Sequence, residues 1–422
     1  MATDVDVQYF SHLNGLVLGN NWGDLIRLLD KALVTGVNFT QITAASIDAQ
    51  GDVHITLFAA HNSMLFQVVE LSGFTPSALN QKYRIKGVPN ATQLILKPKE
   101  AITETSISIM GSGKLAPLGY DIVFRDMNDV KRVYRSKNPT SQHPFIRVDE
   151  TISDGINSYN SSYAKYAMVG LLEDMTHIDD YEDSNKLQLP LDTTDLRKNW
   201  KITGTGTNVV RGWSRWHYAR ISETYNSGND AATPANGARY FSLCGDQDAF
   251  YMFTTVTPTQ TSAKQLLGCG LYNAAIESGV IPNWFLFAPT HLNNASYTLD
   301  HTAISGGWPL FYQLDSSKLL TSAYNPLDRI KNHVLSTPIL PDYKSGKSGL
   351  FNGALVAALE IPFYDSNAVL RGSLKGIFYA GDVRSTNVQT TPILTGNSMY
   401  IYDGTPNSTS TGGCYFYLGE LE

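Results

Sequence analysis

The segment Lys114-Leu115-Ala116-Pro117-Leu118-Gly119-Tyr120-Asp121-Ile122-Val123-Phe124 closes a run of short strand-like segments and opens the longest part of the chain. Two more apolar segments follow it, at residues 132–136 and 144–149. Their aliphatic and aromatic residues are typical of β-strands. Because no catalytic motif competes with this region, it is the most informative part of the sequence.

An amphipathic helix is predicted at residues 21–34, where apolar residues recur three or four positions apart. Asn20 or Asn21 is expected to cap its start, and Gly36 to end it. At about four turns the helix is too short to be stable alone, so its apolar stripe must dock on a surface. Its own domain or a neighbouring subunit can supply that surface. The candidate interface residues are Trp22, Leu25, Ile26, Leu29 and Leu33.

Between this helix and Lys114 the hydrophobic period changes to two. Apolar and polar residues alternate at residues 53–57, 83–85 and 107–109, with turn residues such as Gln50-Gly51-Asp52 between them. Short alternating segments at this spacing predict a small antiparallel sandwich or barrel.

The rest of the chain also favours β-structure. Apolar segments predict strands at residues 122–124, 145–148, 249–255, 284–288, 355–361, 377–379, 399–402 and 414–418, whereas 166–172 fits either period. In the last two of these strands, alternate positions hold tyrosines that can form an aromatic ladder: Tyr400, Tyr402, Tyr415 and Tyr417.

We therefore predict a mainly β protein of several sandwich or barrel modules with a short N-terminal amphipathic helix. The expected parts are an arm and helix (1–36), a small antiparallel β-module (37–113), a central β-rich body (114–337) and a C-terminal β-domain (338–422).

Composition narrows the function. Only 17% of the 422 residues are charged, below the usual level of about 25%, and 23 are tyrosines. This favours extensive contact surfaces. A net charge of −6 argues against nucleic-acid binding. We expect no signal peptide and no membrane span. The widely spaced Cys244, Cys269 and Cys414 are expected to be buried and unpaired.

Two clusters could carry chemistry. The acidic residues at 173–183 suggest a solvated loop, with a divalent-cation site as the alternative. The segment 211–217 could contact a glycan or a protein partner, although a buried strand is the simpler interpretation. Its candidate contact residues are Arg211, Trp213, Arg215, Trp216 and His217. No Gly-x-Ser-x-Gly or His-Glu-x-x-His motif occurs, and we expect no catalytic residue, metal or cofactor.

The order of these elements resembles a family of virion structural proteins of tailed bacteriophages and prophages that are associated with the tail or baseplate. The resemblance covers the helix at 22–36, the pattern of the small β-module from Ile47 to Ile85, and the segments 114–124 and 370–378. The chain departs from the family after Gly73, where Phe74-Thr75-Pro76 replaces smaller residues.

The resemblance implies a structural component of the virion and no enzyme. We expect a tail, tail-tip or baseplate adaptor that assembles with symmetric copies of itself and with tail tube, hub, baseplate or fibre proteins. It would reside in the virion, and in the host cytoplasm during assembly. The alternatives are a receptor-binding protein for host surface glycan, a collar or capsid-associated protein, and a polysaccharide-degrading enzyme.

Overall fold

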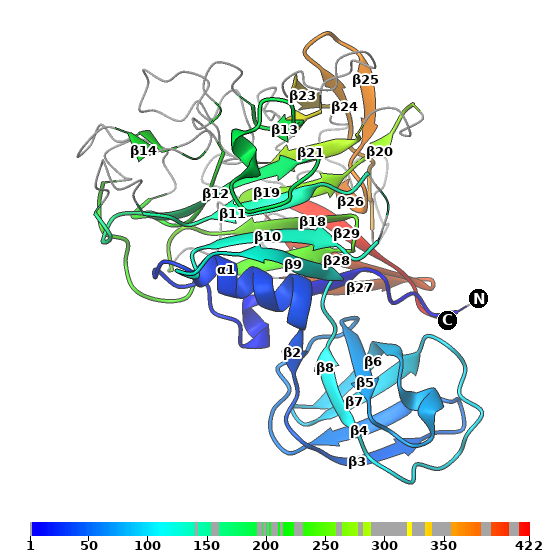
Figure 1. Cartoon of the computed structure of the whole chain (residues 1–422). Coiled ribbons are helices and arrows are strands. Elements are labelled where there is room, and N and C mark those ends of the chain that lie inside the picture. The colour runs from blue at the N-terminus through cyan, green and yellow to red at the C-terminus, as the bar shows by residue number, and fades with distance from the viewer. Residues whose placement is uncertain are drawn as a thin grey trace.

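The computed structural model describes residues 2–138, 140, 142–152, 160–191, 196, 200, 202–203, 210–211, 214–222, 231–258, 264–276, 282–287, 319–322, 334–339, 356–380, 390–404 and 413–422. It confirms the predicted fold class, because 47% of the structure is strand and 7% is helical. Figure 1 shows a stack of sheets, here called the body, and a smaller unit below it, here called the module (residues 37–115).

Within the described residues the strands form four larger sheets and one strand pair, and their pairings are antiparallel. The large sheet has the order β1 (Gln8–Ser11), β17 (Phe241–Gly245), β18 (Ala249–Thr254), β19 (Gln265–Leu271), β21 (Trp284–Phe287), β22 (Leu319–Thr321), β23 (Val334–Pro338), β24 (Pro362–Asp365), β25 (Leu370–Ser373) and β20 (Asn273–Ala274). The helix-bearing sheet has β13 (Gln188–Leu189), β12 (Lys165–Leu172), β11 (Phe145–Asp149), β10 (Lys131–Ser136) and β9 (Tyr120–Arg125), with β16 (Arg215–Ala219) paired to β12.

The module sheet has β2 (Val37–Asn38), β8 (Ser112–Leu115), β5 (Val68–Ser72), β6 (Lys82–Asn90), β7 (Gln93–Pro98), β4 (Val53–Leu57) and β3 (Ile42–Ile47). The C-terminal sheet has β26 (Ile377–Tyr379), β29 (Gly413–Glu420), β28 (Ser398–Gly404) and β27 (Thr391–Thr395). The separate pair is β14 (Ile202–Thr203) with β15 (Val210–Arg211). Short helical turns lie at η1 (His12–Asn14), η3 (Ser77–Leu79) and η4 (Asp180–Glu182).

The body is a stack of three β-layers with the large sheet in the middle. Alternate residues of a strand point to opposite faces. Phe250 and Met252 of β18 pack in the core shared with the helix-bearing sheet, whereas Tyr251 and Phe253 pack in the core shared with the C-terminal sheet. Because both faces of the large sheet are covered, every residue of β18 is buried. The uninterrupted run of aliphatic and aromatic residues at 249–253 follows from this double coverage.

The large sheet crosses two of the expected domain boundaries. The arm contributes β1, which pairs with β17, and β23 pairs with β24 across residue 338. A single hydrogen-bonded sheet therefore joins the arm, the central part and the last part of the chain.

The module is a curled sheet whose two end strands follow one another in the chain. Residues 37–47 contribute both β2, which pairs with β8, and β3, which pairs with β4 at the other end of the sheet. The predicted alternation at 53–57 is correct, because Val53, Ile55 and Leu57 are buried and the residues between them are half-buried. The expected strand at 107–109 is wrong, because this segment makes only the isolated bridge between Thr75 and Ile109.

For two other segments, 166–172 and 355–361, the presence or absence of a partner strand decides whether a strand forms. The ambiguous segment 166–172 lies in β12, which is buried throughout because it pairs with β11, β13 and β16. The strand expected at 355–361 is wrong for its described residues, since Leu359 makes one isolated bridge to Tyr379. A strand forms only where a partner strand supplies a matching row of hydrogen bonds.

The predicted helix exists and lies between the body and the module in Figure 1. It begins as α1 (Asp24–Leu29) and continues as a π-helical segment, η2 (Asp30–Thr35). Gly36 ends it as predicted, with φ +75° and its N–H bonded to the carbonyl of Lys31. A Cβ at Gly36 would lie 2.2 Å from the carbonyl oxygen of Leu115, so only glycine fits here.

The N-terminal segment is held between the module and the body. The side-chain amide of Gln8 in β1 donates to the carbonyls of Val68 and Ala116, at 2.8 Å each, and its oxygen accepts from the N–H of Val68. The segment also pairs with the other end of the chain, since the N–H of Asp4 donates to Glu420. These bonds join residues that are far apart in the sequence.

Arg84 of β6 is the most connected side chain at this junction. It is fully buried, and its five N–H donors reach the carbonyls of Asp4 (2.9 and 2.7 Å), Val7 (3.0 Å), Phe66 (2.7 Å) and Leu418 (3.0 Å). Burial lowers the pKa of Arg84 to about 10, so the guanidinium stays charged at neutral pH. One side chain of the module thus holds both the arm and the last strand of the body.

Replacement of Arg84 by Met should lower the free energy of unfolding by about 3–5 kcal/mol, because four buried carbonyls lose a charged donor. Urea denaturation of the full chain measures this. Arg125→Met is the matched control, since Arg125 is half exposed and should change stability by less than about 0.5 kcal/mol. Equal denaturation midpoints for the two variants would show that the junction does not depend on Arg84.

Candidate functional site

The helical stripe proposed as an interface is buried inside the chain. Leu25, Ile26, Leu29 and Leu33 are at most 1% exposed and belong to the core shared by the module and the body. Trp22 is half-buried, and its ring lies 5.7 Å from that of Tyr166. The interface assignment is therefore corrected: the helix docks on its own chain, which supplies the apolar surface that so short a helix needs.

The start of the helix is capped from a distance and not by Asn20 or Asn21. The Glu150 carboxylate, which follows β11, accepts hydrogen bonds from the N–H groups of Gly23 (2.5 Å) and Ile26 (2.9 Å). It also accepts from the hydroxyl of Tyr218 in β16, at 2.7 Å. A carboxylate at a helix N-terminus satisfies otherwise unpaired N–H groups. Burial raises the pKa of Glu150 to about 7, although these three donors oppose the shift.

The aromatic and basic segment at 211–217 does not form a surface site in its described part. Arg215, Trp216 and His217 lie in β16 and are at most 1% exposed. The indole N–H of Trp216 donates to the carbonyl of Phe287 at 3.0 Å, so this residue packs against the large sheet. For these three residues the contact assignment is corrected to a buried strand. The side chain of Arg211 and the whole of Trp213 lie outside the described residues.

The acidic loop is organised by its own hydrogen bonds. Asp180 accepts from the N–H of Thr176, from that of His177 (3.1 Å) and from the ammonium of Lys186 (3.0 Å). Although burial raises the pKa of Asp180, these donors outweigh it and hold the pKa well below its usual range. Arg147 of β11 donates a hydrogen bond of 2.8 Å to the carbonyl of Ile178 and so links the loop to this strand. Among the described residues no group of His, Cys, Asp or Glu could hold a metal ion.

The tyrosine ladder forms as predicted. Tyr400 and Tyr402 of β28 pair with Tyr417 and Tyr415 of β29, and the paired rings lie 5.3 and 5.4 Å apart. Tyr402 and Tyr415 are buried, whereas Tyr400 and Tyr417 are half-buried. The three cysteines are also buried and unpaired, as expected.

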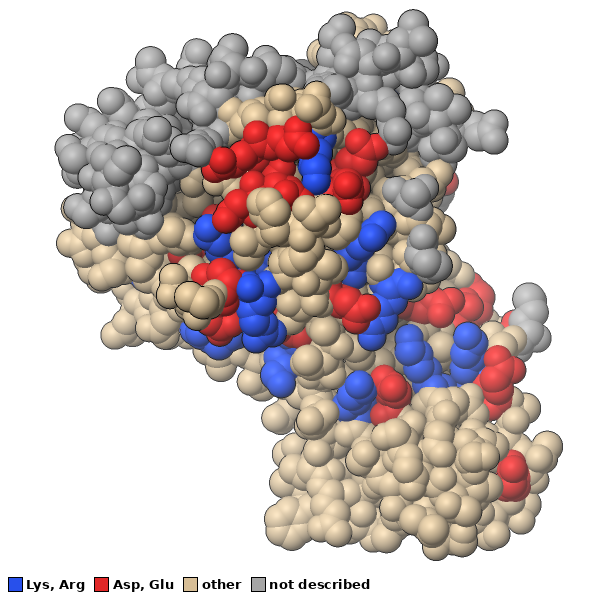
Figure 2. Space-filling model, viewed as in Figure 1, with Lys and Arg blue, Asp and Glu red and all other residues tan. Residues whose placement is uncertain are grey.

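The outer surface of the module has little charge. Residues 37–47 and 53–69 contain no Asp, Glu, Lys or Arg, and Figure 2 shows a nearly uncharged lower part of the module on the viewed face. Phe58, just after β4, is 77% exposed, and its N–H donates to the carbonyl of Gln41 just before β3. Ile109 and Met110 are also exposed.

The edge of β3 adds backbone groups to this surface. Among the described strands β3 pairs only with β4, and Thr43, Ala44 and Ser46 are exposed. Exposed edge strands are usually protected by charges or proline. The edge strand β9 of the body carries Asp121 and Arg125, but β3 has no such residue. We define β3 with Phe58 as the module edge, and this is the candidate contact site.

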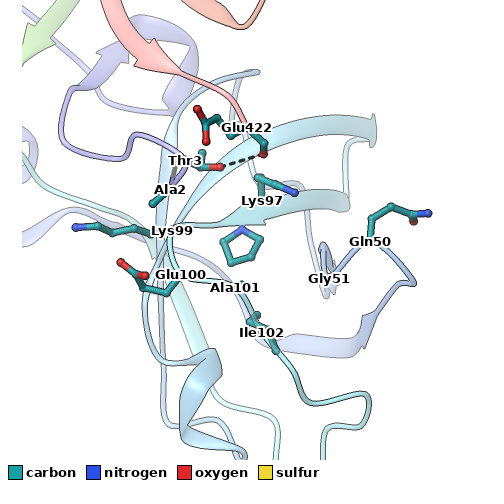
Figure 3. Close-up of a pocket in the computed structure, with 11 residues that line it drawn as sticks. Ala2, Thr3, Gln50, Gly51, Lys97, Lys99, Glu100, Ala101, Ile102 and Glu422 are labelled. Carbon is teal, nitrogen blue, oxygen red and sulfur yellow. Dashed lines mark hydrogen bonds between the residues drawn. The ribbon is translucent and has the colours of Figure 1, made fainter.

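A cleft of about 360 Å³ lies where the module meets both chain ends (Figure 3). Thr3 donates to the carbonyl of Glu422 at 3.2 Å on one side, and Gln50 and Gly51 lie on the other. In Figure 3, Lys97 and Lys99 point to opposite sides, so their charges do not converge on one ligand position. The cleft therefore marks the boundary between the module and the body and is no candidate ligand site.

Comparison with known proteins gives no family. No protein-family model matches this chain, and no curated protein matches it. Among solved structures, a phage phi92 endosialidase aligns with 9% sequence identity over 91% of this chain and 52% of its own length, with a TM-score of 0.15. This chain thus spans about half the length of that enzyme, and a likeness at this TM-score carries no argument. No helix in the described part of the chain could span a membrane.

The contact between Glu150 and the helix should depend on pH. The pKa of Glu150 is raised in the folded state, so the fold binds this proton more tightly than the unfolded chain does. The stabilisation that the fold gains from binding this proton is therefore full below about pH 4.5, and it is lost as the pH rises through about 7. Glu150→Gln should remove this part of the pH dependence.

Urea denaturation between about pH 5 and 8 measures the difference between wild type and variant. Glu100→Gln, on an exposed carboxylate, is the control and should leave the pH profile unchanged. A constant difference between Glu150→Gln and wild type across this range would contradict the assignment.

Proposed function

We propose that this chain is a structural component of a tailed-phage virion, placed in the tail, tail tip or baseplate. There it would act as an adaptor that assembles with symmetric copies of itself and with neighbouring tail proteins. The observation that carries the proposal is the module edge, an exposed and uncharged strand beside an exposed phenylalanine. The resemblance of the helix, the module and the segment 114–124 to virion proteins of such phages supports it.

The module edge suits a permanent contact with a neighbouring virion subunit. The free backbone groups of β3 can pair with a strand of that subunit, and Phe58 can be buried beside the new pair. Charged residues are depleted at the centres of protein interfaces, as they are here. Interfaces of permanent assemblies bury about 2,000 Å² or more, so the edge would be the centre of a larger contact.

The junction of module and body suits an adaptor. Arg84 and Gln8 fix the module to the arm, and through Leu418 to the C-terminal sheet. A module held by buried hydrogen bonds keeps a defined orientation, so a neighbour bound to it would have a fixed position relative to the body. Closed assemblies with cyclic symmetry require repeated contacts of constant geometry.

The receptor-binding alternative loses part of its support. It rested on residues 211–217, whose described side chains are buried, and on the tyrosine-rich C-terminal strands, where Tyr400 and Tyr417 are half-buried. A collar or capsid-associated position would use the same module edge and differs only in the identity of the neighbour. The proposal includes no enzymatic step.

The double variant Ala44→Lys with Phe58→Lys should prevent incorporation into particles while the chain still folds, because it places two charges on the module edge. Both side chains are exposed, so stability should change by less than about 1 kcal/mol. Immunodetection of the chain in purified particles from a phage carrying each variant measures incorporation. Circular dichroism verifies folding.

Val123→Lys with Met127→Lys is the matched control, since both residues are exposed in or after the body strand β9. It should be incorporated like wild type. Absence of the wild-type chain from purified particles would reject the proposed function, and normal incorporation of the module-edge variant would reject the proposed site.

A further inference from the structure

A second cavity, of about 270 Å³, lies where the arm, the large sheet and the C-terminal sheet meet. Its volume is near the lower end of the range for small-molecule sites, about 300–1,000 Å³. Its lining comes from the arm, from β17 and the turn after it, from β18 and the start of β20, from the turn between β25 and β26, and from β26 and β29. It is therefore formed by segments that the three-layer stack brings together.

One end of this cavity is polar and is organised by ion pairs. The ammonium of Lys375 bridges the carboxylates of Asp246 (2.9 Å) and Asp248. His143, which is 3% exposed, bonds Asp248 at 2.9 Å. Burial acts to lower the pKa of Lys375, but the negative charge of Asp246 opposes this effect, and the pKa is raised. Asn273, which is exposed, also lines the cavity.

The remaining walls are apolar and aromatic. Tyr251 stacks on Phe285 with ring centroids 5.2 Å apart and an interplanar angle of 18°, so its position is fixed. Phe416 packs beside it, and Phe378 and Tyr417 are half-buried and line the same cavity. Rigid aromatic walls with a small polar group at one end are typical of ligand sites that fix orientation.

We propose that this cavity binds one neutral saccharide ring. The C–H face of a sugar ring is apolar and packs on aromatic side chains, while its hydroxyls both donate and accept hydrogen bonds. Asp246 offers an acceptor and Lys375 offers a donor. Adjacent carboxylates disfavour an anionic ligand, and the ammonium of Lys375 already occupies the place of a cation.

The proposal is independent of the virion function, because binding is measured on the isolated chain. Saturation-transfer NMR with a panel of neutral hexoses and N-acetylhexosamines should show binding of at least one sugar to the full-length protein. Gly376→Asn tests the site with little cost to folding. Gly376 lines the cavity at φ +72°, a conformation that Asn tolerates, and no heavy atom lies within 4 Å of an added Cβ.

Gly376→Asn should weaken binding at least tenfold. Gly396→Asn is the matched control, since Gly396 has φ +60° with equally open space and does not line the cavity. Lys375→Met should also weaken binding, whereas Lys131→Met, at a lysine that likewise bridges two aspartates, should not. No saturation transfer to any sugar, or equal transfer in Gly376→Asn and Gly396→Asn, would overturn the proposal.

Discussion

The guanidinium of Arg84 is the interaction on which the rest of the structure depends. It sits on a strand of the module but bonds only to main-chain carbonyls, from the arm, from the loop before β5 and from β29. A buried arginine needs all its donors satisfied, so the two chain ends must converge on it. The position of the module relative to the body follows from that requirement.

The three-layer body sets a second constraint, because strands with two covered faces bury polar groups between them. Lys264, just before β19, pairs with Asp403 of β28 between two layers, whereas Arg371 of β25 pairs with Asp365 of β24 within the large sheet. Breaking a pair of this kind leaves an uncompensated buried charge, which makes a shifted alignment of the sheets unfavourable. The same stacking forms the cavity of about 270 Å³ at the junction of the sheets.

Some of this fold could be predicted because the signal is local. The alternation at 53–57, the end of the helix at Gly36 and the tyrosine ladder each depend on neighbours in sequence or on two adjacent strands. The cap of the helix could not be predicted, because Glu150 lies more than a hundred residues from Gly23 in the sequence. A buried strand was already the simpler interpretation of the segment that holds Arg215 to His217, but the large-sheet strand that covers Trp216 at Phe287 could not be predicted.

The sequence by itself determined the β-rich class, the amphipathic helix and the module, because hydrophobic period and turn residues specify local structure. Tertiary structure alone decided which apolar faces stay free. The helical stripe is covered by its own chain, whereas β3 and Phe58 remain exposed. The physical reason is that burial depends on how the layers pack. The sequence shows that an apolar residue favours burial, but it does not show which surface will cover that residue.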